Sequence, residues 1–146
     1  MPERGDVVAE RDYRVDEVDL FLFSAACWLP HRIHYDQAFA REEGLEATPI
    51  HGPLQATWLV QLADEWATQR GARVASSTIR HLSSAYPRQR LHAAAVVESV
   101  EDSSNVSSVV LRLTLTRPGG EAVTTGSATV VTGSRPERSH DRRGCR

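Results

Sequence analysis

A predicted helix that begins at Gly52 constrains the fold of this chain more than any other feature. Gly52 and Pro53 fit its N-cap and first turn, because proline has no N–H to lose there. Large apolar residues then recur every four positions, at Leu54, Trp58, Leu62 and Trp66. Further apolar residues fill the flanks, at Ala56, Leu59, Val60 and Ala63. A helix that is apolar nearly all round its centre has to be enclosed by other structure.

The enclosing structure is predicted downstream of this helix, as an antiparallel sheet. Four segments have the pattern of β-strands: Val74 to Tyr86, Leu91 to Glu101, Val106 to Arg117 and Glu121 to Val131. In the third segment the letters VVLRLTLT alternate as a half-buried strand does, and the letters RPGGE after it predict a hairpin turn. One long buried helix followed by an antiparallel meander predicts an α+β fold.

Shorter elements are predicted before the long helix. A strand is expected near Val7 to Tyr13, and a helical turn that Asp16 opens runs toward Phe23. The segment from Ile33 to Glu43 predicts a short helix that stops at Gly44, since glycine suits a left-handed C-terminal cap.

The chain has the length of one ordinary domain, with 146 residues of which 40% are hydrophobic. We expect a single domain over residues 1–132 and a disordered polar tail over residues 133–146. The two cysteines, Cys27 and Cys145, do not have the pattern of a disulfide framework, which favours a reducing cytoplasm.

Charge and hydropathy argue against several classes of partner. The formal net charge of −2 provides no general attraction to nucleic acid or to an anionic membrane. The first residues are charged and lack the apolar core of a signal peptide, and no apolar run is long enough to cross a bilayer. We therefore expect a soluble cytoplasmic protein with neither nucleic acid nor a membrane as its partner.

Titratable side chains are crowded into the segment CWLPHRIHYDQAFAREEG, from Cys27 to Gly44. Its six positions from His31 to Asp36 hold two histidines, an arginine, a tyrosine and an aspartate. A further histidine, His51, stands directly before the long helix. Because histidine titrates near neutral pH, this composition favours acid/base chemistry.

These residues resemble those of the MaoC-like acyl-thioester hydratases and dehydratases. That family has the hot-dog fold, a curved antiparallel sheet wrapped around a long central helix, and a segment of the type D-x-N-P-x-H-x-D. Its branch with the mesaconyl-CoA hydratases and fatty-acid-synthase-like dehydratases has a variant close to FSALTFNGHRIHYD. Here Phe23 to Asp36 read FSAACWLPHRIHYD, and FAREEG and HGPLQA, both typical of that branch, follow. The resemblance covers Val7 to Thr132.

The resemblance implies addition or elimination at the β-carbon of an acyl thioester, carried on coenzyme A or an acyl carrier protein. Such a reaction needs a group that moves a proton, a group that activates water and a donor to the thioester oxygen. His34 corresponds to the family's catalytic histidine. Gly52 corresponds to the residue whose backbone N–H meets the thioester carbonyl, at the positive end of the helix. The resemblance also implies a homodimer with sites at the subunit interface and no cofactor.

The chain departs from the family pattern five residues before His34. The common form has an aspartate there and the related branch an asparagine, whereas this chain has Leu29. Leucine neither holds water nor accepts a proton. His31 and Asp36 are the nearest residues that could take over this part, so we count them among the catalytic candidates. Alternatively, the attacking group is an amine nucleophile, which brings its own basicity.

Four further residues are predicted to bind substrate: His51, Arg32, Tyr35 and Trp58. Each also has a structural explanation. Arg32 pairs equally well with Asp36, and His51 equally well caps the long helix. Tyr35 and Trp58 fit a hydrophobic core, and Asp36 fits a helix start.

Two rival functions follow from the same residues. A hot-dog thioesterase would show a carboxylate on the central helix, at Asp64 or Glu65. A non-catalytic acyl-binding protein would show a blocked or wholly apolar end to its acyl tunnel. We expect no metal, because the histidines lack a paired spacing such as HExxH. Three arginines are candidates for holding a phosphopantetheine arm, at Arg80, Arg88 and Arg90.

Overall fold

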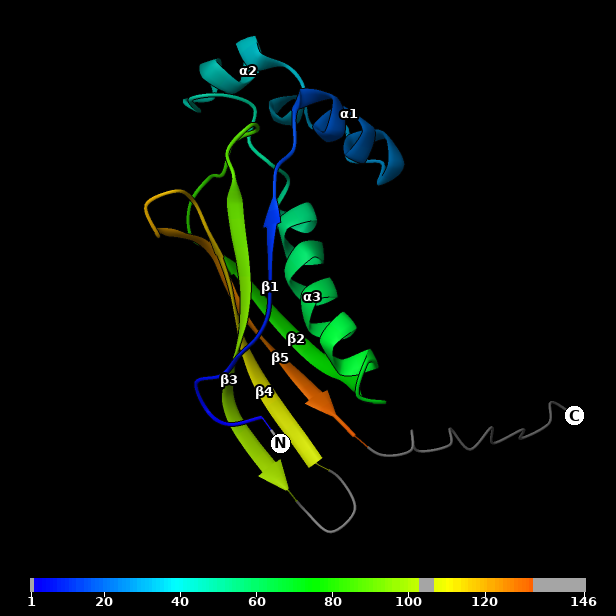
Figure 1. The fold of residues 1–146 in the computed structure, drawn as a ribbon. Coiled ribbons are helices and arrows are strands. Elements are labelled where there is room, and N and C mark those ends of the chain that lie inside the picture. The colour runs from blue at the N-terminus through cyan, green and yellow to red at the C-terminus, as the bar shows by residue number, and fades with distance from the viewer. Residues whose placement is uncertain (1, 103–106, 133–146) are drawn as a thin grey trace, which may run out of the picture.

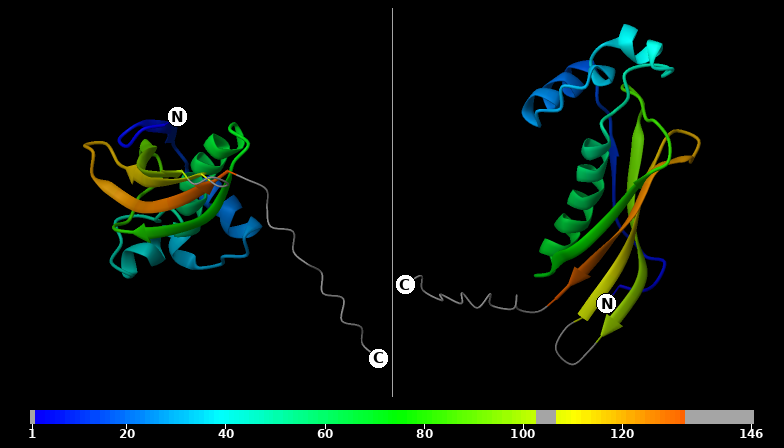
Figure 2. Two further views of the ribbon diagram at one scale, coloured as in Figure 1. Left: turned by 90° about the horizontal axis from the view of Figure 1, so that it is seen from below. Right: turned by 180° about the vertical axis from the view of Figure 1, so that it is seen from behind.

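The computed structural model describes residues 2–102 and 107–132. Its strands are β1 (Val7–Tyr13), β2 (Arg73–His81), β3 (Leu91–Asp102), β4 (Ser107–Thr116) and β5 (Ala122–Val131). They form one antiparallel sheet in the order β1-β3-β4-β5-β2. The sheet curves along one long helix, α3 (Gly52–Thr68), which lies against one of its faces (Figures 1 and 2). The predicted α+β architecture with a central helix is confirmed.

The predicted strands are present, but the one expected over Val74 to Tyr86 is too long. It ends at His81, because Leu82 and Ser83 both donate to the carbonyl of Val123 and so leave the regular ladder. The start predicted for the third strand of the meander, at position 106, lies outside the described residues.

The hairpin turn predicted between β4 and β5 is confirmed. Gly119 and Gly120 have φ values of 99° and 86°, in the left-handed region that glycine enters without a steric penalty. The N–H of Arg117 donates to the carbonyl of Glu121 across the turn, at 3.0 Å.

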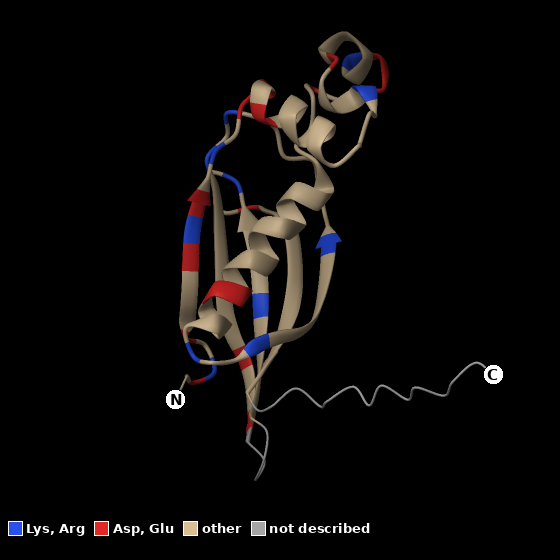
Figure 3. Cartoon of the chain, turned by 90° about the vertical axis from the view of Figure 1, so that its right-hand side faces the viewer, with Lys and Arg blue, Asp and Glu red and all other residues tan. Residues whose placement is uncertain are grey.

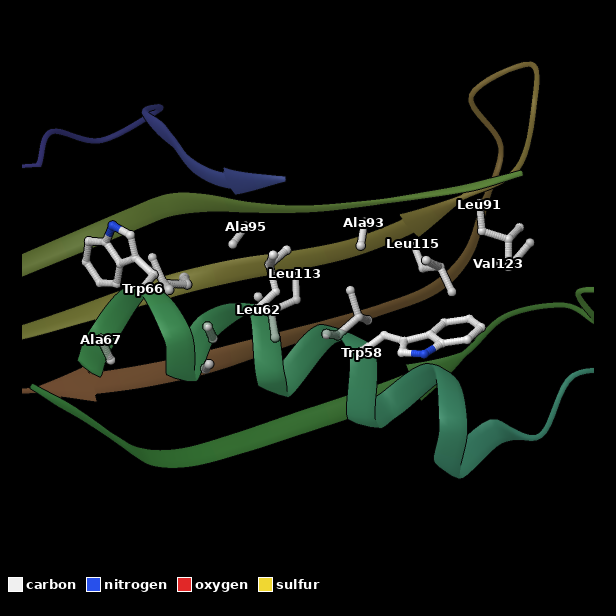
Figure 4. Close-up of a cluster of buried hydrophobic side chains, with 14 of the residues drawn as sticks. Trp58, Leu62, Trp66, Ala67, Leu91, Ala93, Ala95, Leu113, Leu115 and Val123 are labelled. Atoms are coloured by element: carbon white, nitrogen blue, oxygen red, sulfur yellow. The ribbon is translucent and has the colours of Figure 1, made fainter. Parts of the chain in front are cut away.

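The hydrophobic core lies between α3 and the sheet, as Figure 4 shows. From α3 the buried apolar residues are Trp58, Leu59, Leu62, Ala63, Trp66 and Ala67. From β4 they are Leu111, Leu113 and Leu115, each with no exposed surface, which confirms the alternation predicted for this strand. Trp58 stacks on Tyr13 of β1 with ring centroids 4.6 Å apart.

Three short helical elements lie beyond the N-terminal end of α3 (Figure 1). They are α1 (Glu17–Ala26), the 3₁₀ turn η1 (Arg32–His34) and α2 (Gln37–Glu42). Asp16 caps α1 by accepting from the N–H groups of Val18 and Asp19, as expected, and the helix runs three residues beyond Phe23.

The single helix predicted over Ile33 to Glu43 is wrong, because Asp36 divides it. The backbone of Asp36 is extended, and its side chain accepts from the N–H of Phe39 at 3.1 Å, so it is the N-cap of α2. The predicted left-handed residue after this helix is confirmed, with a φ of 82° at Gly44.

The start of α3 also differs by one position from the prediction. The N-cap is His51, and Gly52 and Pro53 occupy the first turn. The side chain of His51 makes no capping hydrogen bond, which rules out the capping role considered for it.

Charged side chains are nearly absent from α3, as Figure 3 shows. Only Asp64 and Glu65 carry charge, and both lie toward its C-terminal end. None of the helices in the described ranges is long and apolar enough to span a membrane. The predicted tail over residues 133–146 lies outside these ranges.

Candidate active site

The candidate site lies at the N-terminal end of α3, on the side of the molecule that carries the short helices α1 and α2 (Figure 1). A buried segment, Thr48–His51, leads into the helix. It is tied to the loop after β2 by a hydrogen bond of 2.8 Å from the N–H of Ile50 to the carbonyl of Ala85.

His34 is held in one tautomer by its backbone neighbour. Its Nδ1 lies 2.8 Å from the carbonyl oxygen of Pro49, and because a carbonyl can only accept, Nδ1 carries the proton. In the neutral ring Nε2 is therefore the nitrogen with the lone pair. Burial lowers the pKa of His34, while the bond to Pro49 opposes this shift.

His51 lies face to face with His34, with ring centroids 3.8 Å apart and ring planes 22° apart. It is fully buried, and its Nε2 is 2.8 Å from the hydroxyl of Ser24 on α1. Burial, followed by the nearby His34, lowers the pKa of His51 to about 4. The inner ring of the pair is therefore neutral at pH 7.

The first turn of α3 presents open hydrogen-bond donors beside these rings. Pro53 has no N–H, and among the residues that the structure describes neither Gly52 nor Leu54 has an acceptor for its N–H. Helix starts of this kind favour a negative charge, because the exposed N–H groups and the positive end of the helix dipole act together. The position suits a thioester oxygen on which charge develops.

Of the five residues predicted from the HRIHYD motif, His34 is the one whose ring stacks on His51 at the start of α3. Arg32 and Asp36 form an ion pair at 2.6 Å, and the other carboxylate oxygen of Asp36 caps α2. The hydrogen bond from Phe39, followed by that from Arg32, lowers the pKa of Asp36. Nδ1 of His31 accepts from the N–H of Ile33 at 3.4 Å. These contacts are local and order the turn that carries His34.

Two other residues predicted to bind substrate, Tyr35 and Trp58, make their contacts outside the stacked histidines. Tyr35 is half exposed and donates from its hydroxyl to the carbonyl of Pro30 at 2.9 Å. Trp58 is in the core, one turn and a half into α3. Leu29, which was predicted to stand where the family pattern has an aspartate, is half-buried, and its N–H donates to the carbonyl of Ser24 at 2.9 Å.

A largely apolar cavity of about 180 Å³ opens next to these groups. It is lined by Phe21, Ser24, Ala25, Trp28, Pro30 and Tyr35. Ser24 is the member that also bonds His51, so the cavity adjoins the histidine pair. Trp28, another of its lining residues, has 85% of its surface exposed.

A third histidine, His81 at the end of β2, was not among the site residues predicted from the sequence. Its Nδ1 lies 3.0 Å from the hydroxyl of Thr124, and its ring packs against Gly52. Thr124 in turn donates to the side-chain oxygen of Gln55 at 2.7 Å. The one signal in the sequence was Gln55, a polar residue on the otherwise apolar part of the helix.

The remaining candidates are engaged elsewhere. Glu65 pairs with Arg11 at 2.7 Å, which lowers the pKa of Glu65. Arg88 pairs with Glu17 at 3.0 Å, and Arg90 pairs with Asp12. Within the described ranges no three or more His, Cys, Asp or Glu side chains are grouped so that they could hold a metal ion.

Comparison with known proteins extends the resemblance. The sequence model of hydroxyacyl-thioester dehydratases type 2 matches residues 2–87. A curated relative, the mesaconyl-C(4)-CoA hydratase of Chloroflexus aurantiacus, is 51% identical over 45 residues. That match covers 30% of this chain but only 16% of the relative's length.

Two solved structures share the fold. The (R)-hydratase from A. caviae involved in PHA biosynthesis has a TM-score of 0.77 and 21% identity, over 90% of this chain and 97% of that one. The MaoC-like dehydratase from Rhodospirillum rubrum has a TM-score of 0.76 and 21% identity, over 92% and 94%. The predicted hot-dog fold is confirmed.

Proposed function

The chain belongs to the hydroxyacyl-thioester dehydratase type 2 family, and on that premise we propose that it adds or eliminates water at the β-carbon of an acyl thioester. The substrate is an enoyl or 3-hydroxyacyl group on coenzyme A or an acyl carrier protein. One observation carries the proposal. His34 keeps a lone pair on Nε2 beside a helix start whose Gly52 N–H has no acceptor among the described residues.

We assign to His34 and the Gly52 N–H a proton transfer at C2 of the acyl group. In dehydration Nε2 of neutral His34 takes the C2 proton, and the electron pair moves to the thioester oxygen. The Gly52 N–H stabilises the charge on that oxygen. The C2–C3 double bond forms as the C3–O bond breaks, and the hydroxyl group takes up a second proton and leaves as water. Hydration is the reverse.

The largely apolar cavity next to His51 favours a substrate whose acyl chain is apolar. Its walls are aromatic and aliphatic apart from Ser24, whose hydroxyl also contacts Nε2 of His51. A wholly apolar or blocked end would favour an acyl-binding protein without catalysis, whereas convergent polar groups favour an enzyme.

The thioesterase alternative loses support from the position of the acidic residues. Asp64 and Glu65 are twelve and thirteen positions along α3 from Gly52, about 20 Å away at 1.5 Å per residue, and Glu65 is paired with Arg11. The amine alternative keeps one specific observation in its favour, which is Leu29. No carboxylate stands there to activate water.

A homodimer is the assembly that we propose, with two sheets joined edge to edge. The strand order leaves β2 at one edge of the sheet. A shallow, mostly apolar surface lies on the nearby face of α3, lined by Ala56, Thr57, Val60, Gln61 and Asp64. Pairing of this edge and this face with a second copy would cover both.

Product analysis with a panel of thioesters tests the function. The full-length protein is incubated with enoyl and 3-hydroxyacyl thioesters of several chain lengths, with and without small amino acids, and the products are weighed. We expect gain or loss of one water without any amine. Product formed only with the amine would support conjugate addition instead. Release of free thiol would support hydrolysis, and binding without any product would support an acyl-binding role.

A further inference from the structure

The imidazole of His81 lies against the first residue of α3. A Cβ atom built on Gly52 would be 2.9 Å from Nε2 of His81 and within 3.3 Å of two of its ring carbons. Real Cβ atoms essentially never show a contact under 3.0 Å, so a side chain at position 52 would displace the ring from this place. His81 therefore reaches the same helix start as His34, but from the end of β2.

A chain of hydrogen bonds fixes which nitrogen of His81 carries a proton. The carbonyl of Ile50 can only accept, so the amide nitrogen of Gln55 donates to it at 3.0 Å. The amide oxygen of Gln55 then accepts the hydroxyl hydrogen of Thr124, at 2.7 Å. Thr124 has no second hydrogen to give, so its oxygen accepts from Nδ1–H of His81, at 3.0 Å.

This polarity leaves Nε2 of His81 as the nitrogen that gains and loses a proton. Nδ1 donates to Thr124 in the neutral ring and in the charged ring alike, so the ring can change its charge without breaking the chain. Gln55 and Thr124 are 3% and 0% exposed, which holds the chain in place. Thus His34 and His81 each have the Nδ1 proton held by a hydrogen bond and, in the neutral ring, a lone pair on Nε2.

We propose that His81 is a second catalytic acid/base of this site and supplies the proton transfer at the C3 oxygen for which Leu29 offers no group. The inference rests on the proposed function. His81 is on β2, far in sequence from the HRIHYD motif. The topology of the sheet brings the end of β2 back to the start of α3.

The two imidazoles then divide the reaction. In dehydration, neutral His34 takes the C2 proton and protonated His81 gives the proton from Nε2 to the departing hydroxyl group as the C3–O bond breaks, so that water leaves. In hydration, neutral His81 takes a proton from water as its oxygen bonds to C3, and protonated His34 gives a proton to C2. After each turnover His34 and His81 each exchange one proton with solvent and return to their starting protonation states. One water is released or consumed per turnover.

The test compares His81→Asn with His92→Asn in the full-length protein. The amide nitrogen of asparagine takes the place of Nδ1 and keeps the bond to Thr124, but it cannot transfer protons. His92 on β3 is likewise an exposed histidine whose Nδ1 contacts a neighbour, Asp12, at 2.9 Å, and it lies outside the site. We expect kcat/KM for an enoyl thioester to fall about 100-fold or more in His81→Asn, as loss of general acid/base catalysis does. His92→Asn should stay within about twofold of wild type, because surface changes away from such features have small effects.

Chemical rescue separates chemistry from packing. In His81→Ala, added imidazole should restore part of the lost rate, and it should leave the rate of wild type unchanged. An active wild type with an unimpaired His81→Asn variant would overturn the role of His81 alone. Lack of rescue together with a dimer that no longer forms would overturn it too, in favour of a structural role. An inactive wild type on the whole thioester panel would overturn the proposed function and this inference together.

Discussion

Burial keeps His51 neutral behind His34, and this limits how many protons the pair can hold. The rings stack at 3.8 Å, and the pKa of His51 is lowered to about 4. In the unfolded chain an imidazole titrates near pH 6.5. Above that pH neither state is protonated at His51. As the pH falls from 6.5 toward 4, the unfolded chain binds a proton that the folded chain does not, so the free energy of unfolding decreases.

Replacing His51 by glutamine should therefore make the protein less sensitive to acid. Glutamine keeps a hydrogen-bonding group for Ser24 and has no charge to gain. We expect the loss of unfolding free energy between pH 7 and pH 5 to be smaller in His51→Gln than in wild type, as measured by urea unfolding at both pH values. A smaller loss remains, because the pKa of His34 is lowered as well. An equal loss in both proteins would show that His51 is not a buried neutral imidazole.

At the scale of the elements, patterns of hydrophobicity and capping predicted most of what is present. The four-residue spacing of Leu54, Trp58, Leu62 and Trp66 predicted α3, and the alternation in β4 predicted its buried face. The error over residues 33–43 has a physical cause. An aspartate inside an apparent helix can equally cap a new one, and Asp36 does so because it accepts from Phe39.

The exposed edge strand β2 and the apolar face of α3 lead to a prediction about assembly. Val60 lies in the middle of that face, whereas Val7 lies on β1 at the opposite edge of the sheet. We expect wild type and Val7→Arg to have twice the mass of one chain by light scattering. We expect Val60→Arg to shift toward the mass of a single chain, because a buried unpaired charge opposes association.

The opposite pattern, with Val7→Arg dissociated and Val60→Arg intact, would move the interface to the β1 edge. A wild-type protein with the mass of one chain at micromolar concentration would contradict the proposed homodimer.

At the scale of the whole molecule, the site is assembled from segments that sequence reasoning treats separately. The motif around His34 was readable because its residues are adjacent in the chain. His81, Thr124 and Gln55 are not, and they meet only because the sheet brings β2 and β5 beside the start of α3. The polar Gln55 on α3 is a signal in the sequence, but no local pattern places His81 beside Gly52, so this contact is found from the structure.

The central claim is that Nε2 of His34 exchanges the C2 proton with the substrate. Its most direct test is the rate of enoyl-thioester hydration by wild type and by His34→Asn. Asparagine preserves the hydrogen bond to the carbonyl of Pro49 but removes Nε2. We predict that the rate falls at least about 100-fold while the protein stays folded and binds the substrate. Turnover by folded His34→Asn at the wild-type rate would contradict the account.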